Sequence, residues 1–116
     1  MEVQIFGTKK CSDTRKALRF FSERRVKTHF VDLKQKAASV GELRRFVQKF
    51  GVEAVIDRDS KHFLNLGLRQ AAYSDERWLE LLAEEPLILR TPLVRSKGRL
   101  TVGHEPDRWT DWMAES

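Results

Sequence analysis

The chain has 116 residues, which is enough for one domain with a single hydrophobic core. Hydrophobic residues make up 41%, and no apolar run approaches the roughly 20 residues that a membrane span needs. The 22 Lys and Arg residues exceed the 17 Asp and Glu residues, but the signs are interspersed, so we expect no direct nucleic-acid contact. The N-terminus lacks the features of a signal peptide. We expect a cytoplasmic monomer.

The first part of the chain predicts a strand, a helix and a second strand. Val3–Phe6 is an apolar-rich segment typical of a short strand, and Gly7 ends it. Apolar residues at helical spacing follow, and Ser12 or Asp13 is expected to cap this helix. Polar and apolar residues then alternate over Lys27–Leu33, which predicts the second strand. Because a helix of crossover length connects the two strands, we expect them to be parallel.

Helical signals dominate the middle of the chain. Ser39 and Glu42 fit a capping box, and Gly51 is the stop signal of the same helix. Short helical pieces are predicted within residues 52–68, and Ser74 is expected to cap another helix. The predicted apolar faces of the two longer helices are Leu43, Phe46, Val47 and Phe50 in the first, and Trp78, Leu79, Leu81 and Leu82 in the second.

The last part of the chain predicts strands and a closing helix. Residues 87–90, "LILR", are expected to form a strand, and the chain is extended again after Pro92. "KG" at 97–98 is a hairpin signal, and a short helix is expected from Pro106. This order predicts an α/β fold of the thioredoxin-like type. We expect a mixed four-stranded sheet flanked by helices, with a helical insertion in the middle, all in one domain over residues 1–116.

The chain's single cysteine, Cys11, lies between the first predicted strand and the first long helix. The helix N-terminus stabilises an anion there, and Lys9, Lys10 and Arg15 add positive charge. Each influence favours the thiolate, which is the reactive form. Thr14 makes the spacing C-x-x-T, so a second thiol has to come from another molecule. The alternative is that Cys11 is a small buried apolar residue, as most free cysteines are.

Residues 5–21, "IFGTKKCSDTRKALRFF", resemble the opening of the arsenate reductase (ArsC) family. In that family a strand leads to a nucleophilic cysteine, with an arginine four residues later, and Cys11 and Arg15 match this pattern. The resemblance continues through residues 56–68, "IDRDSKHFLNLGL", and 86–103, "PLILRTPLVRSKGRLTVG", to the closing tryptophan helix. It therefore covers nearly the whole chain. The "RKA" tripeptide also resembles the related Spx and MgsR regulators.

The resemblance implies that Cys11 is the nucleophile and that glutathione or a glutaredoxin supplies the external thiol. Glutathione is then a co-substrate, and no bound cofactor or metal is expected. The family holds its oxyanion with three arginines. Arg58 matches one of them, whereas Thr91 and His104 stand at the other two positions. Charge-assisted contacts contribute about 1.5–3 kcal/mol each, so the loss of two weakens oxyanion binding by roughly 3–6 kcal/mol. We therefore expect inefficient arsenate reduction.

The resemblance also implies that the Thr91–Pro92 peptide bond is cis and faces the active cysteine. This expectation is specific, because only about 5–6% of X–Pro bonds in folded proteins are cis. Cys11 and Arg15 are thus the predicted catalytic residues. The predicted substrate-binding residues are Lys10, Arg58, Thr91, Pro92 and His104.

Two main hypotheses about function follow, and a third possibility is a degenerate family member that retains no chemistry. The first is a monothiol oxidoreductase, in which the Cys11 thiolate attacks an oxyanion or a glutathione-type disulfide. The second is an Spx-like regulatory module that binds RNA polymerase and has no reductase activity. Because those regulators often carry C-x-x-C as a redox switch, Thr14 weakens the second hypothesis.

Overall fold

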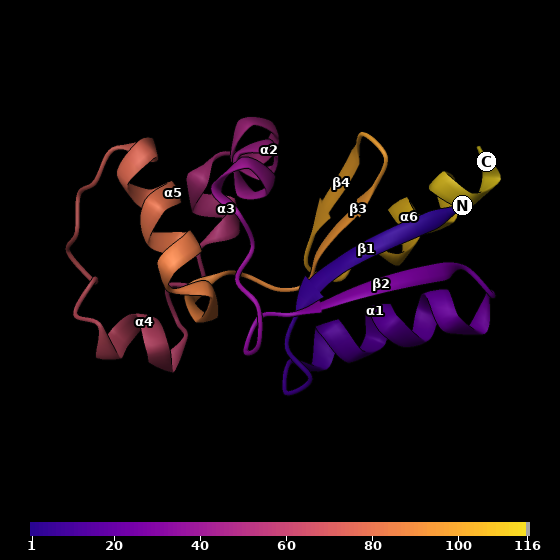
Figure 1. Ribbon diagram of the computed structural model, residues 1–116, viewed down its shortest axis with the longest axis horizontal. Helices are drawn as coiled ribbons and strands as arrows, with labels where there is room; N and C mark the ends of the chain where they lie inside the picture. The colour runs from indigo at the N-terminus through magenta and orange to yellow at the C-terminus, as the bar shows by residue number, and fades with distance from the viewer. Residues whose placement is uncertain (116) are drawn as a thin grey trace. The chain divides into compact units, whose positions relative to one another are not determined.

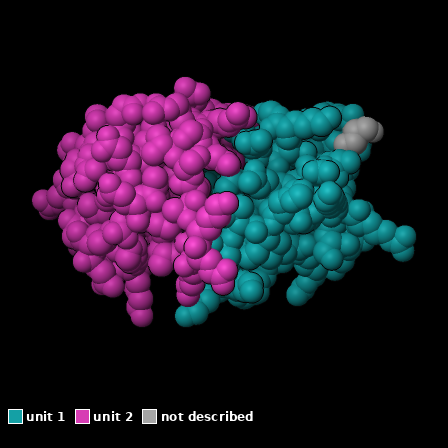
Figure 2. All heavy atoms as spheres, in the orientation of Figure 1, with its two compact units in different colours: residues 1–32, 91–116 teal, residues 33–90 magenta. Residues whose placement is uncertain are grey.

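The structure is a computed structural model that describes residues 1–115, and it divides into two units (Figure 2). Unit 1 consists of Met1–Asp32 together with the segment that begins at Thr91. Unit 2 is Leu33–Arg90, which is inserted between the two segments of unit 1. Its place in the chain is that of the predicted helical insertion. The expectation of one domain over the whole chain stays a prediction.

Unit 1 contains a four-stranded sheet. Its strands are β1 (Glu2–Gly7), β2 (Lys27–Asp32), β3 (Leu93–Ser96) and β4 (Arg99–Val102), in the spatial order β2-β1-β3-β4 (Figure 1). The strands β1 and β2 are parallel, whereas β3 is antiparallel to both β1 and β4. Lys97, in the β3–β4 turn, has a φ of 56°, as a tight hairpin turn requires. The predicted mixed sheet and hairpin are confirmed.

Two helices of unit 1 pack on one face of this sheet. They are α1 (Ser12–Glu23) and α6 (Pro106–Ala114), both at predicted positions. The indole N–H of Trp109 donates to the hydroxyl of Thr101, at 2.8 Å, and both side chains are buried. This bond satisfies the one polar atom of a large buried ring. The core of the unit consists of Val3, Ile5, Ala17, Phe21, Val94, Trp109 and Trp112.

Unit 2 is helical. It contains α2 (Val40–Phe50), α3 (Val52–Val55), α4 (Lys61–Asn65), α5 (Asp75–Glu84) and the 3-10 helix η1 (Pro86–Ile88). Every helix within residues 1–115 is too short or too polar to cross a lipid bilayer. The buried apolar side chains of these helices are Leu43, Phe46, Val47, Val55, Phe63, Trp78, Leu79, Leu81, Leu82 and Ile88.

The predicted caps of unit 2 are confirmed. The Ser39 hydroxyl accepts the N–H of Glu42 at the start of α2, and the Ser74 hydroxyl accepts the N–H of Arg77 in α5. Gly51 ends α2 with a φ of 85°, which glycine adopts without strain. Phe50, however, is 38% exposed and lies outside the apolar face to which it was assigned. It is the last residue of α2, and the ammonium group of Lys49 lies 5.5 Å from the centroid of its ring.

The strand predicted at residues 87–90 is wrong. Pro86 begins a 3-10 turn, in which Leu89 donates its N–H to the Pro86 carbonyl at 3.2 Å. Proline fixes φ near −65° and so favours this turn over an extended start. Only Leu89 makes a β-type contact, an isolated bridge to Ile56. The apolar composition of the segment is explained by the burial of Ile88 and Leu89.

We predict that Thr101→Val destabilises the protein by about 1–3 kcal/mol, because the buried indole N–H of Trp109 loses its acceptor. The free energy of unfolding is measured by urea denaturation, followed by far-UV circular dichroism. The matched control is the same change in a Trp109→Phe background, which has no indole N–H. In that background, Thr101→Val should lower the free energy of unfolding by a clearly smaller amount. Equal costs in the two backgrounds would show that the bond contributes nothing to stability.

Candidate functional site

Cys11 occupies the N-cap position of α1. Its N–H donates to the Thr8 carbonyl at 3.1 Å, and its own carbonyl accepts the first intrahelical bond, from Arg15, at 3.1 Å. The expectation that Ser12 or Asp13 caps the helix is therefore wrong. In the described structure no side-chain hydrogen bond caps α1. The thiol instead stands where a cap oxygen accepts N–H groups of the first helical turn.

The pKa of Cys11 is lowered from its ordinary value. The largest single influence is burial of the partly buried thiol, which raises the pKa. Hydrogen bonds outweigh it. The side chains of Thr14 and Thr91 and the backbone N–H groups of Thr14 and Asp13 all lower the pKa. The backbone N–H groups belong to the helix N-terminus, which was expected to stabilise the thiolate, whereas the expected positive side chains of Lys9, Lys10 and Arg15 are not among these influences on the pKa.

Thr14 is the residue whose role the sequence analysis missed. Its side chain is 0% exposed, and its Oγ1 has no hydrogen-bond partner of ordinary length in the described structure. An unpaired buried hydroxyl costs about 1–3 kcal/mol. A thiolate at Cys11 attracts this hydroxyl, which lies near enough to lower the pKa although it makes no ordinary bond. The spacing in the sequence could have indicated this role, because the residue three positions after an N-cap residue faces the side chain of that residue.

Gly7 determines where the Thr14 side chain lies. A Cβ atom built on Gly7 would be 2.4 Å from Thr14 Oγ1 and 2.6 Å from Thr14 Cγ2. Real side chains do not approach so closely, so only glycine lets the end of β1 touch the first turn of α1 here. The glycine that the sequence marks as a strand end therefore also shapes the surroundings of the thiol.

The segment that begins at Thr91 also lies beside the Cys11 thiol. The Thr91–Pro92 peptide bond is cis, which confirms the expectation from the resemblance. The Cys11 thiol donates to the Thr91 carbonyl across 3.7 Å, although 80 positions separate the two residues. The Pro92 carbonyl accepts the N–H of Gly103 at 2.8 Å, which anchors this segment beside β4. Thr91 thus interacts with Cys11 in two ways, since its carbonyl accepts from the thiol and its side chain lowers the pKa of the thiol.

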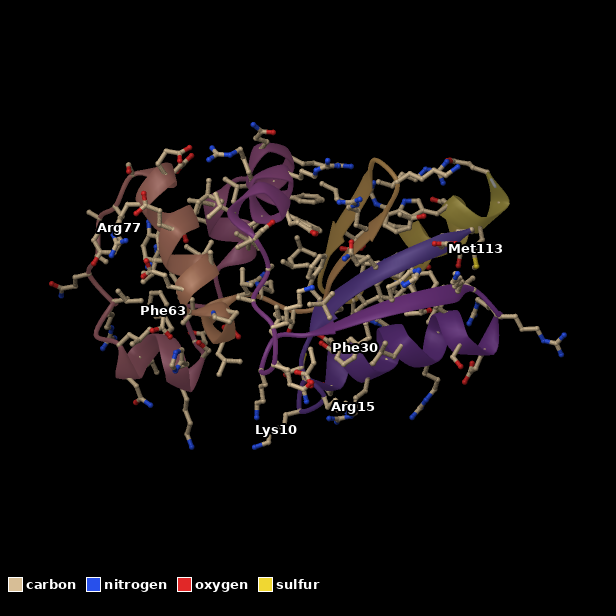
Figure 3. All side chains as sticks on the ribbon, in the orientation of Figure 1. Lys10, Arg15, Phe30, Phe63, Arg77 and Met113 are labelled. Atoms are coloured by element: carbon tan, nitrogen blue, oxygen red, sulfur yellow. The ribbon has the colours of Figure 1, made fainter. Side chains whose placement is uncertain are left out.

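The other predicted residues of unit 1 lie on the surface. Figure 3 shows Lys10 and Arg15 at the start of α1, where both are exposed. Arg15 donates to the Lys9 carbonyl at 2.8 Å and so braces the loop that carries Cys11. His104 is exposed, and its ring packs edge-on against Trp109, with centroids 5.7 Å apart. The roles predicted for these residues stay predictions.

Arg58 is the one predicted site residue in unit 2. It follows α3, and its Nε and Nη2 atoms donate to the two carboxylate oxygens of Glu53, at 2.7 and 2.6 Å. Its guanidinium also lies over the rings of Phe63 and Trp78. The anion-binding role of Arg58 stays a prediction. Within residues 1–115, no group of three or more His, Cys, Asp or Glu side chains is arranged to hold a metal ion.

Several known proteins are similar to this chain in sequence or in fold. The family model described as "ArsC family" matches residues 6–112. The global transcriptional regulator Spx 2 of Oceanobacillus iheyensis is 28% identical, over 92% of this chain and 80% of that protein. An arsenate reductase of Neisseria meningitidis is 26% identical, over 88% of this chain and 90% of that protein. A solved structure, the YFFB protein, has a TM-score of 0.85 and 26% identity, and the match covers 94% of this chain and 96% of that one.

We predict that Thr14→Val slows alkylation of Cys11 by iodoacetamide at neutral pH, by about three- to tenfold. Losing a donor raises the pKa and lowers the thiolate fraction, while the thiolate's greater intrinsic nucleophilicity offsets part of the loss. The rate is measured from pH 5 to 9. Because the native pKa is lowered, wild-type reactivity should persist to lower pH than that of the variant. Thr28→Val is the control, since the Thr28 hydroxyl donates to the Val26 carbonyl. Identical pH profiles for wild type and Thr14→Val would contradict the role of Thr14.

We predict that Gly7→Ala destabilises the protein by about 1–3 kcal/mol and slows alkylation of Cys11. The added methyl group overlaps the Thr14 side chain, which then has to move. Gly98→Ala is the matched control, because nothing lies within 4 Å of a Cβ atom built there. Unfolding free energy and alkylation rate are measured on both variants. If Gly7→Ala behaves like Gly98→Ala, the close contact does not constrain the site.

Proposed function

The chain belongs to the ArsC family, and we propose that it is a monothiol oxidoreductase with Cys11 as its nucleophile. One observation supports this proposal. Cys11 occupies the N-cap position of α1, and nearby hydrogen-bond donors lower its pKa. Among these donors, Thr14 has a buried hydroxyl without a hydrogen-bond partner of ordinary length in the described structure. A small buried apolar cysteine needs no such donors. A thiolate that reacts at neutral pH does.

The substrate proposed is a mixed disulfide of glutathione. The Cys11 thiolate attacks the glutathionyl sulfur, so that a bond forms between Cys11 and glutathione while the original disulfide breaks. The thiol that was joined to glutathione in the substrate leaves as a thiolate and takes up a proton. A second glutathione, or a glutaredoxin, then attacks the Cys11–glutathione disulfide and releases the Cys11 thiolate. The substrate disulfide is reduced, and glutathione is oxidised.

The residues around the thiol favour such a disulfide over arsenate. Thr91 and His104 stand where the resemblance places arginines, so a doubly charged oxyanion lacks two charge-assisted contacts there. Thr91 offers a neutral hydroxyl and a carbonyl beside the thiol. A disulfide carries no charge at its reacting sulfur atoms and does not need the missing arginines. Arg58 remains a proposed anion-binding residue.

The test is the reaction of the purified chain with a glutathionylated peptide and reduced glutathione. We expect release of the peptide thiol, transient glutathionylation of Cys11 seen by mass spectrometry, and no activity in Cys11→Ser. At neutral pH the thiol should react about tenfold faster than free cysteine. In a parallel assay with arsenate we expect little reduction. A thiol that reacts no faster than free cysteine and forms no adduct with glutathione would overturn the proposal.

A second candidate function comes from the match to Spx 2, whose printed name is that of a transcriptional regulator. On this alternative the chain binds RNA polymerase and performs no reduction. The C-x-x-T spacing leaves no partner for a disulfide within the first turn of α1. Binding to purified RNA polymerase that is equal for wild type and Cys11→Ser, combined with an unreactive thiol, would favour this function. A reactive thiol without polymerase binding would favour the oxidoreductase.

A further inference from the structure

Arg58 already binds an anion, and that anion is part of the chain. The Glu53 carboxylate presents both oxygens to the Nε and Nη2 atoms of Arg58, at 2.7 and 2.6 Å. This paired arrangement is the geometry with which a guanidinium binds a carboxylate or two oxygens of an oxyanion. The edge of Arg58 best suited to a ligand is therefore filled by Glu53.

The rest of the surroundings hold Arg58 in place independently of Glu53. Its guanidinium carbon lies 5.4 Å from the ring centroid of Phe63 and 5.6 Å from that of Trp78. These two rings stack on each other and are almost completely buried, so they form a fixed apolar platform. Ser60 also donates its N–H and its hydroxyl to the Asp57 carbonyl, which closes the turn that carries Arg58. Removal of Glu53 should leave Arg58 positioned.

We propose that Glu53 is an internal competitor for the anionic ligand of Arg58 and so determines how tightly this chain binds anions. The inference rests on the proposed function in one respect, that Arg58 has an anionic ligand. The class of ligand is an anion with two oxygens in the spacing of a carboxylate. A carboxylate of glutathione and a tetrahedral oxyanion both meet this description.

The exposure of the pair makes the exchange feasible. The side chain of Glu53 is 64% exposed and that of Arg58 is 37% exposed. Ion pairs this open to water are weak, so a ligand can displace Glu53 at a modest cost. The Arg58 guanidinium also lowers the pKa of Glu53, so the carboxylate stays charged and competes at neutral pH. We expect Glu53→Gln to raise anion affinity by about two- to fivefold.

The chain contains a matched control. Arg44 and Glu76 form another two-bond ion pair in unit 2, and their side chains are 39% and 64% exposed. Glu76→Gln changes the net charge by the same amount as Glu53→Gln and also frees a guanidinium. The two variants therefore differ in which arginine is released, and a general effect of charge would raise anion affinity equally in both.

The experiment follows the Nε–Hε NMR signal of Arg58 in the full chain carrying Cys11→Ser. Sodium phosphate and S-methylglutathione are titrated separately, as the oxyanion and the carboxylate probe. For at least one probe, we expect Glu53→Gln to bind two- to fivefold more tightly than its parent, and Glu76→Gln to match the parent. The probe that shows the gain identifies which source of anion the subsite takes. Arg58→Lys in the Glu53→Gln background lacks this signal and is titrated by isothermal calorimetry beside its parent, where it should remove the gain.

Several outcomes would overturn the inference. They are equal affinity in Glu53→Gln and its parent, an equal gain in Glu76→Gln, and no response of Arg58 to either probe. Because the titration uses Cys11→Ser, its result does not depend on thiol chemistry. Failure of the proposed function appears separately, as an unreactive Cys11 in the wild-type chain.

Discussion

The contact between Gly7 and Thr14 is the constraint on which the thiol site depends. Gly7 is the last residue of β1, and the preceding Phe6 is paired with Val31 in β2 and Leu93 in β3, so the sheet fixes where β1 ends. Since Gly7 has no Cβ, the first turn of α1 can approach this end until Thr14 fills the vacant space. The helix start, and with it Cys11, is thereby placed by the sheet rather than by a capping side chain.

Two opposing effects act on the thiol once it is placed there. Partial burial favours the neutral form, whereas the hydroxyls and N–H groups around Sγ favour the thiolate. Together these donors outweigh the effect of burial, so the pKa of Cys11 is lowered. Three come from Asp13 and Thr14, in the first turn of α1, and one comes from Thr91, which precedes β3. The reactive form of Cys11 thus depends on the α1–β1 contact and on the path of the chain into β3.

Features determined by neighbouring residues could be predicted from the sequence. The Ser39 cap, the stop at Gly51 and the hairpin turn at 97–98 each depend on one short segment, and all three are confirmed. The mixed sheet, with a parallel first pair of strands and an antiparallel hairpin, followed from the order of the predicted elements. Residues 87–90 could not be assigned from local composition, because their conformation depends on the turn at Pro86 and on a bridge to Ile56.

The site was predictable to a similar extent. Three successive residues, Cys11, Ser12 and Asp13, have side chains able to accept a cap bond, so sequence alone could not say which one ends up at the N-cap. The burial of Thr14 depends on a glycine in another element. The pairing of Glu53 with Arg58 spans the end of α3 and an irregular turn, and therefore follows no helical spacing rule.

The distribution of donors bears on the choice of substrate. Around Cys11, the groups that lower its pKa are neutral hydroxyls and amides. Such donors stabilise one negative charge on sulfur, but they contribute much less than guanidinium groups to the binding of a multiply charged oxyanion. Arg58, which the resemblance matches to an oxyanion-binding arginine, has its own carboxylate partner, so its net attraction for an external anion is reduced. A thiolate stabilised in this way gains reactivity without a matching gain in oxyanion affinity, and this combination suits attack on a disulfide.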